Sequence, residues 1–277
     1  MNQINFNRDK TIEKLAKLRE MQVCDVPKDS LIKTQQQIDG IIESGKINTG
    51  VLDYVASKIK AGVTTADIDD WVKDYTESHG AICAPYQYGG FPKHVCTSID
   101  DVVCHGIPSK KAVLTEGMII NVDVSTIYKG YYSDASRMFI IGNTTDEKKR
   151  LVDVCKQCLN VGLSQVKPYG RLGDIGYAIE SLAISKGYKV VRDYCGHGVG
   201  NAFHEDPMVM HYGKKNTGCL LVPGMVFTIE PMLNMKKSGV KVSAVDGWTA
   251  YTKDKLPSAQ WEHTVLVTED GFEILTY

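Results

Sequence analysis

The second half of this chain repeats landmarks of the first half at one fixed spacing. Four landmarks recur 107 positions later: Lys60 as Lys167, Asp67-Ile68 as Asp174-Ile175, Gly80 as Gly187, and Gly117-Met118 as Gly224-Met225. A constant offset of this size is typical of an ancient duplication. A chain of 277 residues is long enough for two packed halves. We therefore expect two related halves, at about residues 34–142 and 143–277, arranged about a pseudo-twofold axis.

The composition excludes several classes of protein. Hydrophobic residues make up 43% of the chain and charged residues 23%, with a net charge of −1, which is typical of a globular protein. The near-zero charge argues against a dedicated, sequence-specific nucleic-acid binder. No apolar run reaches the ~20 residues of a membrane span, and residues 1–20 do not resemble a signal peptide. We expect a cytoplasmic protein without membrane contact, whose eight cysteines are reduced thiols.

The order of expected elements also repeats. A capping box at Thr34–Gln37 predicts a helix to about Lys60, and a second helix follows Thr65 and stops at Gly80. Residues 81–141 are rich in strand signals. A capping box at Thr144–Glu147 then opens a helix to about residue 166, and Asp174 caps another that stops at Gly187. Residues 1–33 read as a helical extension ending in a linker at Pro27, and residues 34–277 as the main domain.

Four carboxylates fall at related places in the two halves. Moving 107 positions from Asp123 reaches Glu230, although acidic residues are depleted in strands. Asp134 lies across the turn Tyr128-Lys129-Gly130 from Asp123, either directly opposite it or one diagonal step away. Glu262 is related to Glu230 by a two-residue hairpin predicted at Asp246-Gly247. A pseudo-twofold axis would bring all four acids together.

Four like charges in a protein interior need cations to neutralise them. Two divalent ions balance four carboxylates, so we expect a dinuclear site. Its oxygen ligands favour manganese, iron or cobalt over thiolate-bound zinc. His197 and His204, in the glycine-rich segment 195–207, are further candidate site residues, and His105 is a third.

Other motifs are interpreted as structural. His79 lies at an expected helix end, and His94, His211 and His263 have no evident partners. His263 should also point away from the site because neighbouring strand residues alternate faces. Cys155 and Cys158 have redox-motif spacing. They also belong to an apolar helical stripe with Leu151 and Val154, so we expect both sulfurs to lie in the core.

Six motifs resemble those of type I methionine aminopeptidases. They are Val-Cys-His105-Gly-Ile-Pro, Asn-Val-Asp123-Val, Asp134-x-Ser-Arg-Met, Cys-Gly-His197-Gly-x-Gly-x-x-Phe-His204-Glu-x-Pro, Phe-Thr-Ile-Glu230-Pro-Met and Gln-x-Glu262-His-Thr. They occur in the family's order over nearly all of the chain beyond the extension. The resemblance implies the α/β (α+β) pita-bread fold, in which two αβ halves surround a curved antiparallel sheet with helices packed on its outside.

The resemblance also implies roles for these residues. Asp123 would bind one metal, His197 and Glu230 the other, and Asp134 and Glu262 would bridge both, with cobalt, manganese, iron or zinc as the metal. A metal-bridging hydroxide would attack the carbonyl carbon after the first methionine. His204 would stabilise the developing oxyanion, and His105 would hold the scissile amide. Glu230 would carry the proton to the leaving amine.

The substrate implied by the family is a peptide or nascent chain with an N-terminal methionine and a small, uncharged second residue. Five residues match the walls of the family's methionine pocket: Tyr88, Phe91, Cys96, Phe203 and Trp248. Three more match a loop that binds a monovalent cation in some relatives: Asp100, Val102 and Ser258. The family's habit suggests a monomer.

Residues 1–31 are an addition to the shortest bacterial relatives, and we hypothesise that they pack across the catalytic domain or contact the ribosome. Two other functions compete with methionine removal. Proline-specific aminopeptidases and prolidases share the His197–Pro207 pattern, but they typically carry a large extra N-terminal domain for which this chain has no room before Thr34. A catalytically silent binding module typically loses metal ligands, and all five candidates are present here.

Overall fold

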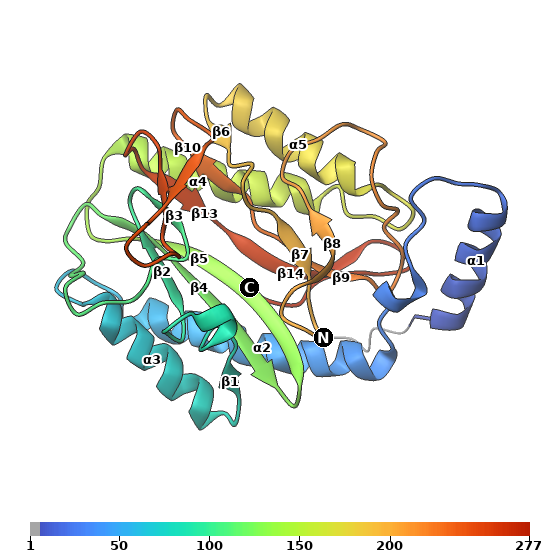
Figure 1. Ribbon diagram of the computed structural model, residues 1–277, viewed down its shortest axis with the longest axis horizontal. Coiled ribbons are helices and arrows are strands. Elements are labelled where there is room, and N and C mark those ends of the chain that lie inside the picture. The colour runs from blue at the N-terminus through green and yellow to red at the C-terminus, as the bar shows by residue number, and fades with distance from the viewer. Residues whose placement is uncertain (1–5) are drawn as a thin grey trace.

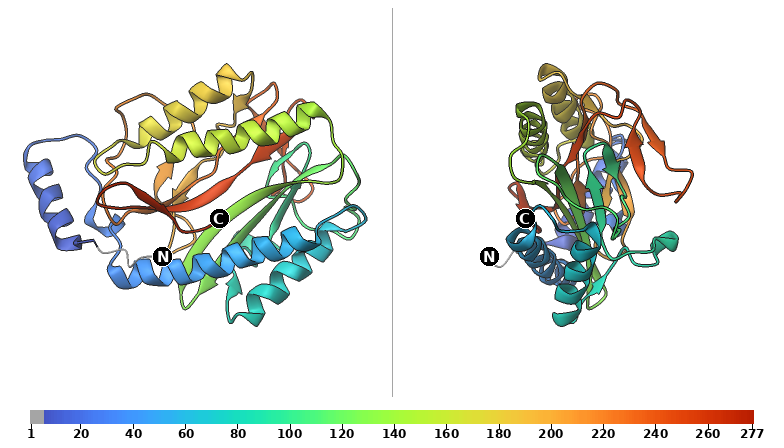
Figure 2. Two further views of the ribbon diagram at one scale, coloured as in Figure 1. Left: turned by 180° about the vertical axis from the view of Figure 1, so that it is seen from behind. Right: turned by 90° about the vertical axis from the view of Figure 1, so that its left-hand side faces the viewer.

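A curved antiparallel sheet and the helices packed along it form the body of the protein. The computed structural model describes residues 6–277. Helices α2 and α3 belong to the first half of the chain, and α4 and α5 belong to the second half. Strands of both halves lie between the two pairs of helices (Figure 1). In the edge view, α2, α4 and α5 lie along one side of the sheet (Figure 2). The helices are α1 (Arg8–Glu20), α2 (Gln35–Lys58), α3 (Thr65–Ser78), α4 (Asp146–Leu163) and α5 (Leu172–Ser185).

The main sheet joins strands from both halves. Its order is β1-β4-β5-β14-β9-β7-β8, with β2 also paired to β4 and β15 to β14. Its strands are β1 (Ile82–Cys83), β2 (Cys96–Ile99), β4 (Ile119–Tyr128), β5 (Tyr131–Ile140), β7 (Gly196–Gly198), β8 (Glu205–Val209), β9 (Val226–Ile229), β14 (Glu262–Val267) and β15 (Phe272–Ile274). Two smaller sheets contain β6 (Lys189–Val190), β10 (Met232–Asn234) and β13 (Ser258–Gln260), and β3 (Val102–Cys104), β11 (Val240–Val242) and β12 (Ala250–Thr252).

The offset of 107 positions holds in the folded chain. Helix α5 begins and ends 107 positions after α3, and β6 follows β1 at the same distance. The isolated bridges Thr64–Val113 and Arg171–Leu220 are related by the same spacing. Strand β9 begins 107 positions after β4. The sequence repeat is therefore a structural repeat.

Two of the expected helix starts are wrong by one to three residues. Thr34 and Gln37 form the expected capping box of α2. However, α4 is capped by Thr145, because Thr144 donates its hydroxyl to the Gly117 carbonyl instead. Asp174 lies inside the first turn of α5, where its carboxylate accepts from the Arg171 amide at 3.3 Å. An acidic residue in a first turn satisfies amides that the helix leaves free.

The two hairpins expected around the carboxylates differ in outcome. Strands β4 and β5 are joined by the expected tight turn, with Lys129 and Gly130 both at positive φ. The two-residue hairpin expected at Asp246-Gly247 is wrong. Residues 243–249 form a longer loop between β11 and β12, which belong to a separate small sheet. Glu230 and Glu262 are brought together by the pairing of β9 with β14 instead.

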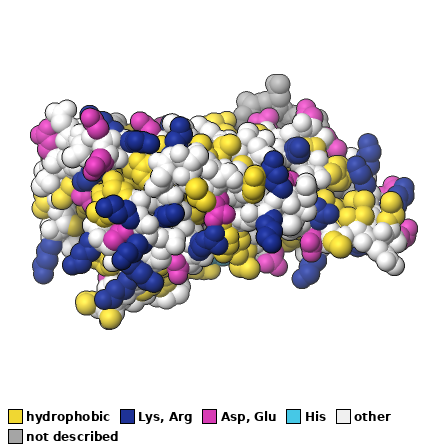
Figure 3. Space-filling model, turned by 90° about the horizontal axis from the view of Figure 1, so that it is seen from above, with side chains coloured by type: hydrophobic (Ala, Val, Ile, Leu, Met, Phe, Trp, Pro, Cys, Tyr) yellow, Lys and Arg dark blue, Asp and Glu magenta, His cyan; other side chains and the backbone are white. Residues whose placement is uncertain are grey.

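The cores lie between the helices and the sheet. One cluster lies under α4 and α5 and includes Cys155 and Cys158, both fully buried as expected. Another lies under α2 and α3 and includes Val51, Ile68 and Val122. No disulfide joins any of the eight cysteines. On the face drawn in Figure 3, Lys and Arg side chains occur in separate groups with Asp and Glu between them.

The N-terminal segment packs against the second half of the chain. Leu15 of α1 is fully buried and belongs to the core cluster of α4 and α5. Lys14 lies over the Tyr169 ring at 3.3 Å, and the Leu220 amide donates to the Asp25 carbonyl at 3.0 Å. This segment is therefore tied to the body by apolar burial and by backbone hydrogen bonds.

Truncation of Leu15 should measure this packing. We expect Leu15→Ala to lower the free energy of unfolding by about 2–4 kcal/mol, because it removes a buried side chain from the core. Met21→Ala is the matched control in the same segment, since Met21 is 73% exposed. Urea unfolding followed by circular dichroism measures both. Equal, small effects of the two variants would contradict the packing of α1.

Candidate functional site

Two hairpin strands position the first pair of carboxylates. Asp123 lies on β4 opposite Ser136, and Asp134 lies on β5 opposite Ser125. The two acids are therefore diagonal neighbours on one face, the second of the two arrangements expected.

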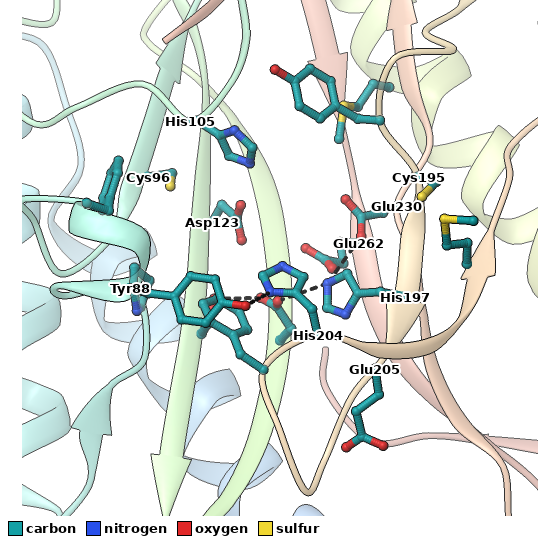
Figure 4. Close-up of a pocket in the computed structure, with 18 of the residues that line it drawn as sticks. Tyr88, Cys96, His105, Asp123, Cys195, His197, His204, Glu205, Glu230 and Glu262 are labelled. Atoms are coloured by element: carbon teal, nitrogen blue, oxygen red, sulfur yellow. Dashed lines mark hydrogen bonds and ion pairs between the residues drawn. The ribbon is translucent and has the colours of Figure 1, made fainter. Parts of the chain in front are cut away.

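The second pair comes from the other half of the chain. His263 pairs with Ile229 in the β9–β14 ladder, which places Glu262 opposite Glu230 at the end of β9. Strand β14 also pairs with β5, where Glu262 is opposite Ser136. All four acids line one cavity of about 690 Å³. Figure 4 shows Asp123 on one side of this cavity and Glu230 and Glu262 on the other.

Burial and mutual repulsion disfavour the charged form of these acids. The pKa of Asp123 rises to about 7 because of burial, and that of Glu230 rises to about 8 because of burial and the Asp123 charge. The pKa values of Asp134 and Glu262 are also raised well above their ordinary range by burial and by neighbouring carboxylates. Asp123 Oδ1 is buried without a hydrogen-bond partner. Such a group of acids is suited to divalent cations.

His197 completes the candidate metal-binding group. Its Nδ1 donates a hydrogen bond to the Gly198 carbonyl at 3.0 Å, while Nε2 lies 3.6 Å from Asp134 and 3.7 Å from Glu230. Burial lowers its pKa to about 4, so the ring is neutral at pH 7. Donor atoms of Asp134, His197 and Glu262 lie within 4.8 Å of one another. A histidine held through Nδ1 with Nε2 facing carboxylates has the usual orientation of a metal ligand.

Several residues that support the site were not identified from the sequence. Thr228 donates to Glu230 at 2.9 Å and accepts from the His197 amide at 3.0 Å. Gln260 donates to Glu230 at 3.2 Å, and Ser125 donates to Asp134 at 2.9 Å. Thr228 and Gln260 lie two positions before a carboxylate, and Ser125 lies opposite one. Polar residues at that spacing share a face of the strand with the acid, which is the signal that could have identified them.

His211 was assigned no partner, and the structure gives it one beside the site. It is 1% exposed, and its Nε2 accepts from the Glu230 amide at 3.1 Å. Burial lowers its pKa to about 3, which keeps it neutral as this hydrogen bond requires. His211 therefore fixes the backbone that carries Glu230.

The remaining candidate histidines line the cavity in two places. His204 shares a hydrogen bond with the Tyr88 hydroxyl at 2.9 Å, and its ring centroid lies 4.2 Å from that of His197. His105 has φ of 56° and packs edge-on against Tyr194 and Trp248. Burial lowers the pKa of both histidines, that of His105 to about 4. Both rings are therefore neutral near pH 7 and can take part in hydrogen bonds without carrying a charge.

The five residues expected to form the methionine pocket line the same cavity. They are Tyr88, Phe91, Cys96, Phe203 and Trp248. Phe91 meets Trp248 edge-on at 5.3 Å, and Tyr88 meets Phe203 edge-on at 4.8 Å. Burial raises the pKa of Cys96 well above its usual range, so its thiol is neutral. The wall therefore consists of aromatic rings and a polarisable sulfur, which suits a thioether side chain.

Residues expected to lie outside the site do so. His79 stacks on Tyr75, His94 pairs with Asp69 and stacks on Tyr86, and His263 lies near Tyr277.

At the expected cation loop, Ser258 donates its amide to the Asp100 carbonyl at 2.8 Å. The Lys148 ammonium lies 2.7 Å from Asp100 Oδ1. Asp100 therefore already has a cationic partner within the chain.

Four buried carboxylates and a neutral histidine around one cavity are typical of the active sites of metal-dependent hydrolases. Residues 39–269 match the model of the metallopeptidase family M24, and the chain belongs to that family. The family is metal-dependent, and the residues assembled here fit divalent metal ions. The curated relatives include methionine aminopeptidase A of Synechocystis, 49% identical over 88% of this chain and 96% of the relative. They also include the Escherichia coli methionine aminopeptidase, 44% identical over 88% of this chain and 93% of the relative.

Solved structures confirm the pita-bread fold. The methionine aminopeptidase of Rickettsia prowazekii superposes with a TM-score of 0.87 at 46% identity, covering 89% of this chain and 99% of that one. The prolidase of Pyrococcus furiosus shares the fold at 23% identity and a TM-score of 0.69, but this chain covers 65% of it. The resemblance found in the sequence is thus confirmed at the level of family and fold.

Metal removal should make stability depend on pH. In metal-free protein the raised pKa values of Asp123, Asp134, Glu230 and Glu262 mean that the folded state holds protons that the unfolded chain releases near pH 4. The stability that these four acids contribute is therefore fully present below about pH 4 and is lost as the pH rises toward about 7 to 8. The buried histidines, whose pKa values are lowered, act in the opposite direction below about pH 6.5. We therefore expect the Tm of EDTA-treated protein to fall between about pH 6.5 and 8, where the histidines are neutral in both states, and Mn²⁺ to restore it.

The controls for metal removal are variants of the acids. Asp123→Asn and Glu230→Gln each remove one titrating group, so the fall in Tm with pH should become shallower. Differential scanning calorimetry with and without Mn²⁺ gives the comparison. A Tm that is independent of both pH and Mn²⁺ would contradict a buried, cation-binding carboxylate cluster.

A buried ion pair ties the N-terminal segment to the loop that carries His204. Lys33 is 1% exposed, and its ammonium pairs with Glu205. The other oxygen of Glu205 accepts from the amides of Asn201 and Ala202, at 2.6 and 2.8 Å. Glu205 thereby holds the loop from which Phe203 and His204 enter the cavity. The ion pair with Lys33 therefore stabilises this loop through Glu205.

Removing Lys33 should lower the free energy of unfolding more than removing the lysine of an exposed ion pair. We expect Lys33→Met to lower the free energy of unfolding by about 3 kcal/mol, because Glu205 is left without a counter-charge. The double variant Lys33→Met/Glu205→Gln should recover part of this loss. Lys129→Met is the control, since its pair with Glu43 is exposed and should contribute less than about 1 kcal/mol. Urea titrations compare the three; equal losses in both single variants would contradict the importance of burial.

Proposed function

We propose that this protein is a methionine aminopeptidase that removes the N-terminal methionine from peptides and nascent chains. The observation that carries the proposal is the cavity itself, in which the carboxylate cluster and the aromatic wall adjoin. Curated relatives that the chain matches over most of their length carry the same activity in their names. A prolidase activity is not favoured, because the resemblance to prolidases is one of fold.

We propose that five residues hold two divalent cations: Asp123, Asp134, His197, Glu230 and Glu262. Two cations balance four carboxylates and leave His197 as the neutral ligand. The oxygen-rich set accepts manganese, iron, cobalt or zinc, and cellular supply decides among them. When bound, the cations would acidify a water molecule and polarise the scissile carbonyl.

The chain's own residues supply positioning and proton transfer. His204, which is hydrogen-bonded to Tyr88, would donate a hydrogen bond to the carbonyl oxygen as charge develops there. His105 would hold the amide on the other side of the scissile bond. Glu230, oriented by Thr228 and Gln260, would take a proton from the attacking water and deliver it to the leaving nitrogen.

Specificity for methionine would come from the aromatic wall. Tyr88, Phe91, Phe203 and Trp248 enclose the space beside Cys96. Sulfur–aromatic contacts favour an unbranched thioether, and a branched or charged first residue would lose them. The small second residue is carried over from the family, and a cation near Asp100, Val102 and Ser258 stays a prediction.

The setting of the enzyme is also a proposal. None of the described helices combines the length and the apolar character that crossing a membrane requires. We propose a cytoplasmic monomer with residues 1–33 as an extension of the catalytic domain. Contact of the extension with the ribosome is retained as a hypothesis, and co-sedimentation with ribosomes tests it.

Methionine release from Met-Gly-Met-Met is the direct test. We expect metal-stripped protein to release methionine on titration with Mn²⁺ or Co²⁺, and a Leu-initiated control peptide to be cleaved far more slowly. Asp134→Ala should reduce kcat/KM by at least about 100-fold, because it removes a carboxylate from the metal-binding group. Amino-acid analysis of the products measures the release.

The alternatives give different results in the same assay. Cleavage of X-Pro peptides with Met-Gly-Met-Met untouched would establish a proline-specific enzyme. No release with any metal, together with the absence of bound divalent ions by elemental analysis, would establish a silent binding module. Asp70→Ala is a suitable control for folding, because Asp70 is exposed on α3 and does not line the cavity.

A further inference from the structure

A second cavity of about 510 Å³ lies next to the candidate catalytic cavity. Asp206 and Met208 line both cavities. The two residues belong to β8, the last strand in the order of the main sheet. Strand β8 pairs with β7 on one side, and within residues 6–277 no strand pairs with its other side. The two cavities therefore meet along an open sheet edge.

The N-terminal segment builds one wall of the second cavity. This wall consists of Asp25, Val26, Pro27, Lys28 and Leu31, and the opposite wall includes Leu172, Met210, Tyr212 and Cys219. The segment is held in place by backbone and side-chain hydrogen bonds. Arg171 donates to the Cys24 carbonyl at 2.8 Å, and Arg19 donates to the Pro27 carbonyl at 2.6 Å. Without this segment the second cavity would be an open surface.

The lining of the second cavity suits an extended apolar peptide. Met208 is 63% exposed, so a large flexible side chain lies uncovered between the two cavities. Val26, Leu31 and Met210 add apolar surface, while Asp25 and Lys28 are exposed. The unpaired edge of β8 offers backbone carbonyls to an extended chain, and backbone amides except at Pro207, which has no N–H. Neighbouring apolar recesses accept the side chains of such a chain.

We propose that the second cavity binds the residues of the peptide substrate that follow the second residue, with a preference for apolar side chains. This inference rests on the proposed aminopeptidase function. The substrate of such an enzyme is the end of a longer chain, and every residue after the second has to leave the catalytic cavity. An extended chain advances about 3.3 Å per residue, so a few residues suffice to cross β8. The N-terminal segment is then a determinant of specificity.

A series of peptides tests the proposal. The peptides are Met-Ala-Ser, Met-Ala-Ser-Leu-Leu-Leu with a charged C-terminal tag for solubility, and the same tagged peptide with serines in place of leucines. We expect kcat/KM to be about fivefold to tenfold higher for the leucine peptide than for the serine peptide, because two or three apolar side chains become partly buried. Val26→Glu should lower kcat/KM for the leucine peptide to that for the serine peptide, and it should change the rate on Met-Ala-Ser much less, because that peptide brings only one small side chain to the second cavity.

Matched variants separate binding from folding. Val113→Glu makes the same chemical change at a 42% exposed position outside both cavities, and it should keep the leucine preference. Lys28→Glu changes an exposed residue of the wall and should lower kcat/KM for a peptide with glutamates at those positions. Tm values of all variants show whether each one is folded.

Failure of this inference differs from failure of the proposed function. If Met-Ala-Ser is not cleaved by wild-type protein with any metal, the aminopeptidase function itself is wrong. If Met-Ala-Ser is cleaved but leucine and serine peptides have equal kcat/KM, the second cavity does not bind the substrate. Equal effects of Val26→Glu on all three peptides would also overturn the proposal.

Discussion

The repulsion among four buried carboxylates is the physical constraint on which the candidate site depends. Asp123, Asp134, Glu230 and Glu262 come from strands of both halves and line one cavity, with pKa values raised by burial and, for three of them, by one another. An apolar interior does not tolerate four such groups as bare anions. Divalent cations remove the conflict, and the same cations supply the chemistry expected of a metallopeptidase. Folding and function therefore depend on the same charges.

The geometry of β-strands explains how the site is supported. Alternation places Thr228 and Gln260 on the same faces as Glu230 and Glu262, so side-chain donors reach Glu230 from two directions. His211 holds the backbone amide of Glu230 from outside the sheet. A glutamate whose carboxylate accepts two hydrogen bonds and whose backbone amide donates a third keeps its orientation when its protonation or its metal changes. These supports lie in the short stretches that flank the ligand motifs.

The N-terminal segment is physically coupled to the site. Lys33 reaches Glu205, and Glu205 holds the loop of Phe203 and His204. The preceding residues 25–31 close a second cavity across β8. One short stretch of chain thus touches both the loop that carries a candidate catalytic histidine and the surface over which a peptide would leave. An extension that packs in this way can influence catalysis as well as stability.

The sequence by itself determined that the chain is duplicated, that four carboxylates and His197 are candidate site residues, and which family the chain belongs to. A fixed offset and an ordered set of motifs can be read directly from the linear sequence. The sequence also determined the core positions of Cys155 and Cys158 through their helical spacing. Only the tertiary structure decided that Glu230 and Glu262 meet through β9 and β14, since strand pairing over more than 30 positions leaves no local signal. The partners of His211, Lys33 and Asp100 were likewise decided by contacts between segments far apart in the chain. Such contacts depend on packing in three dimensions, which turn signals and periodicity do not record.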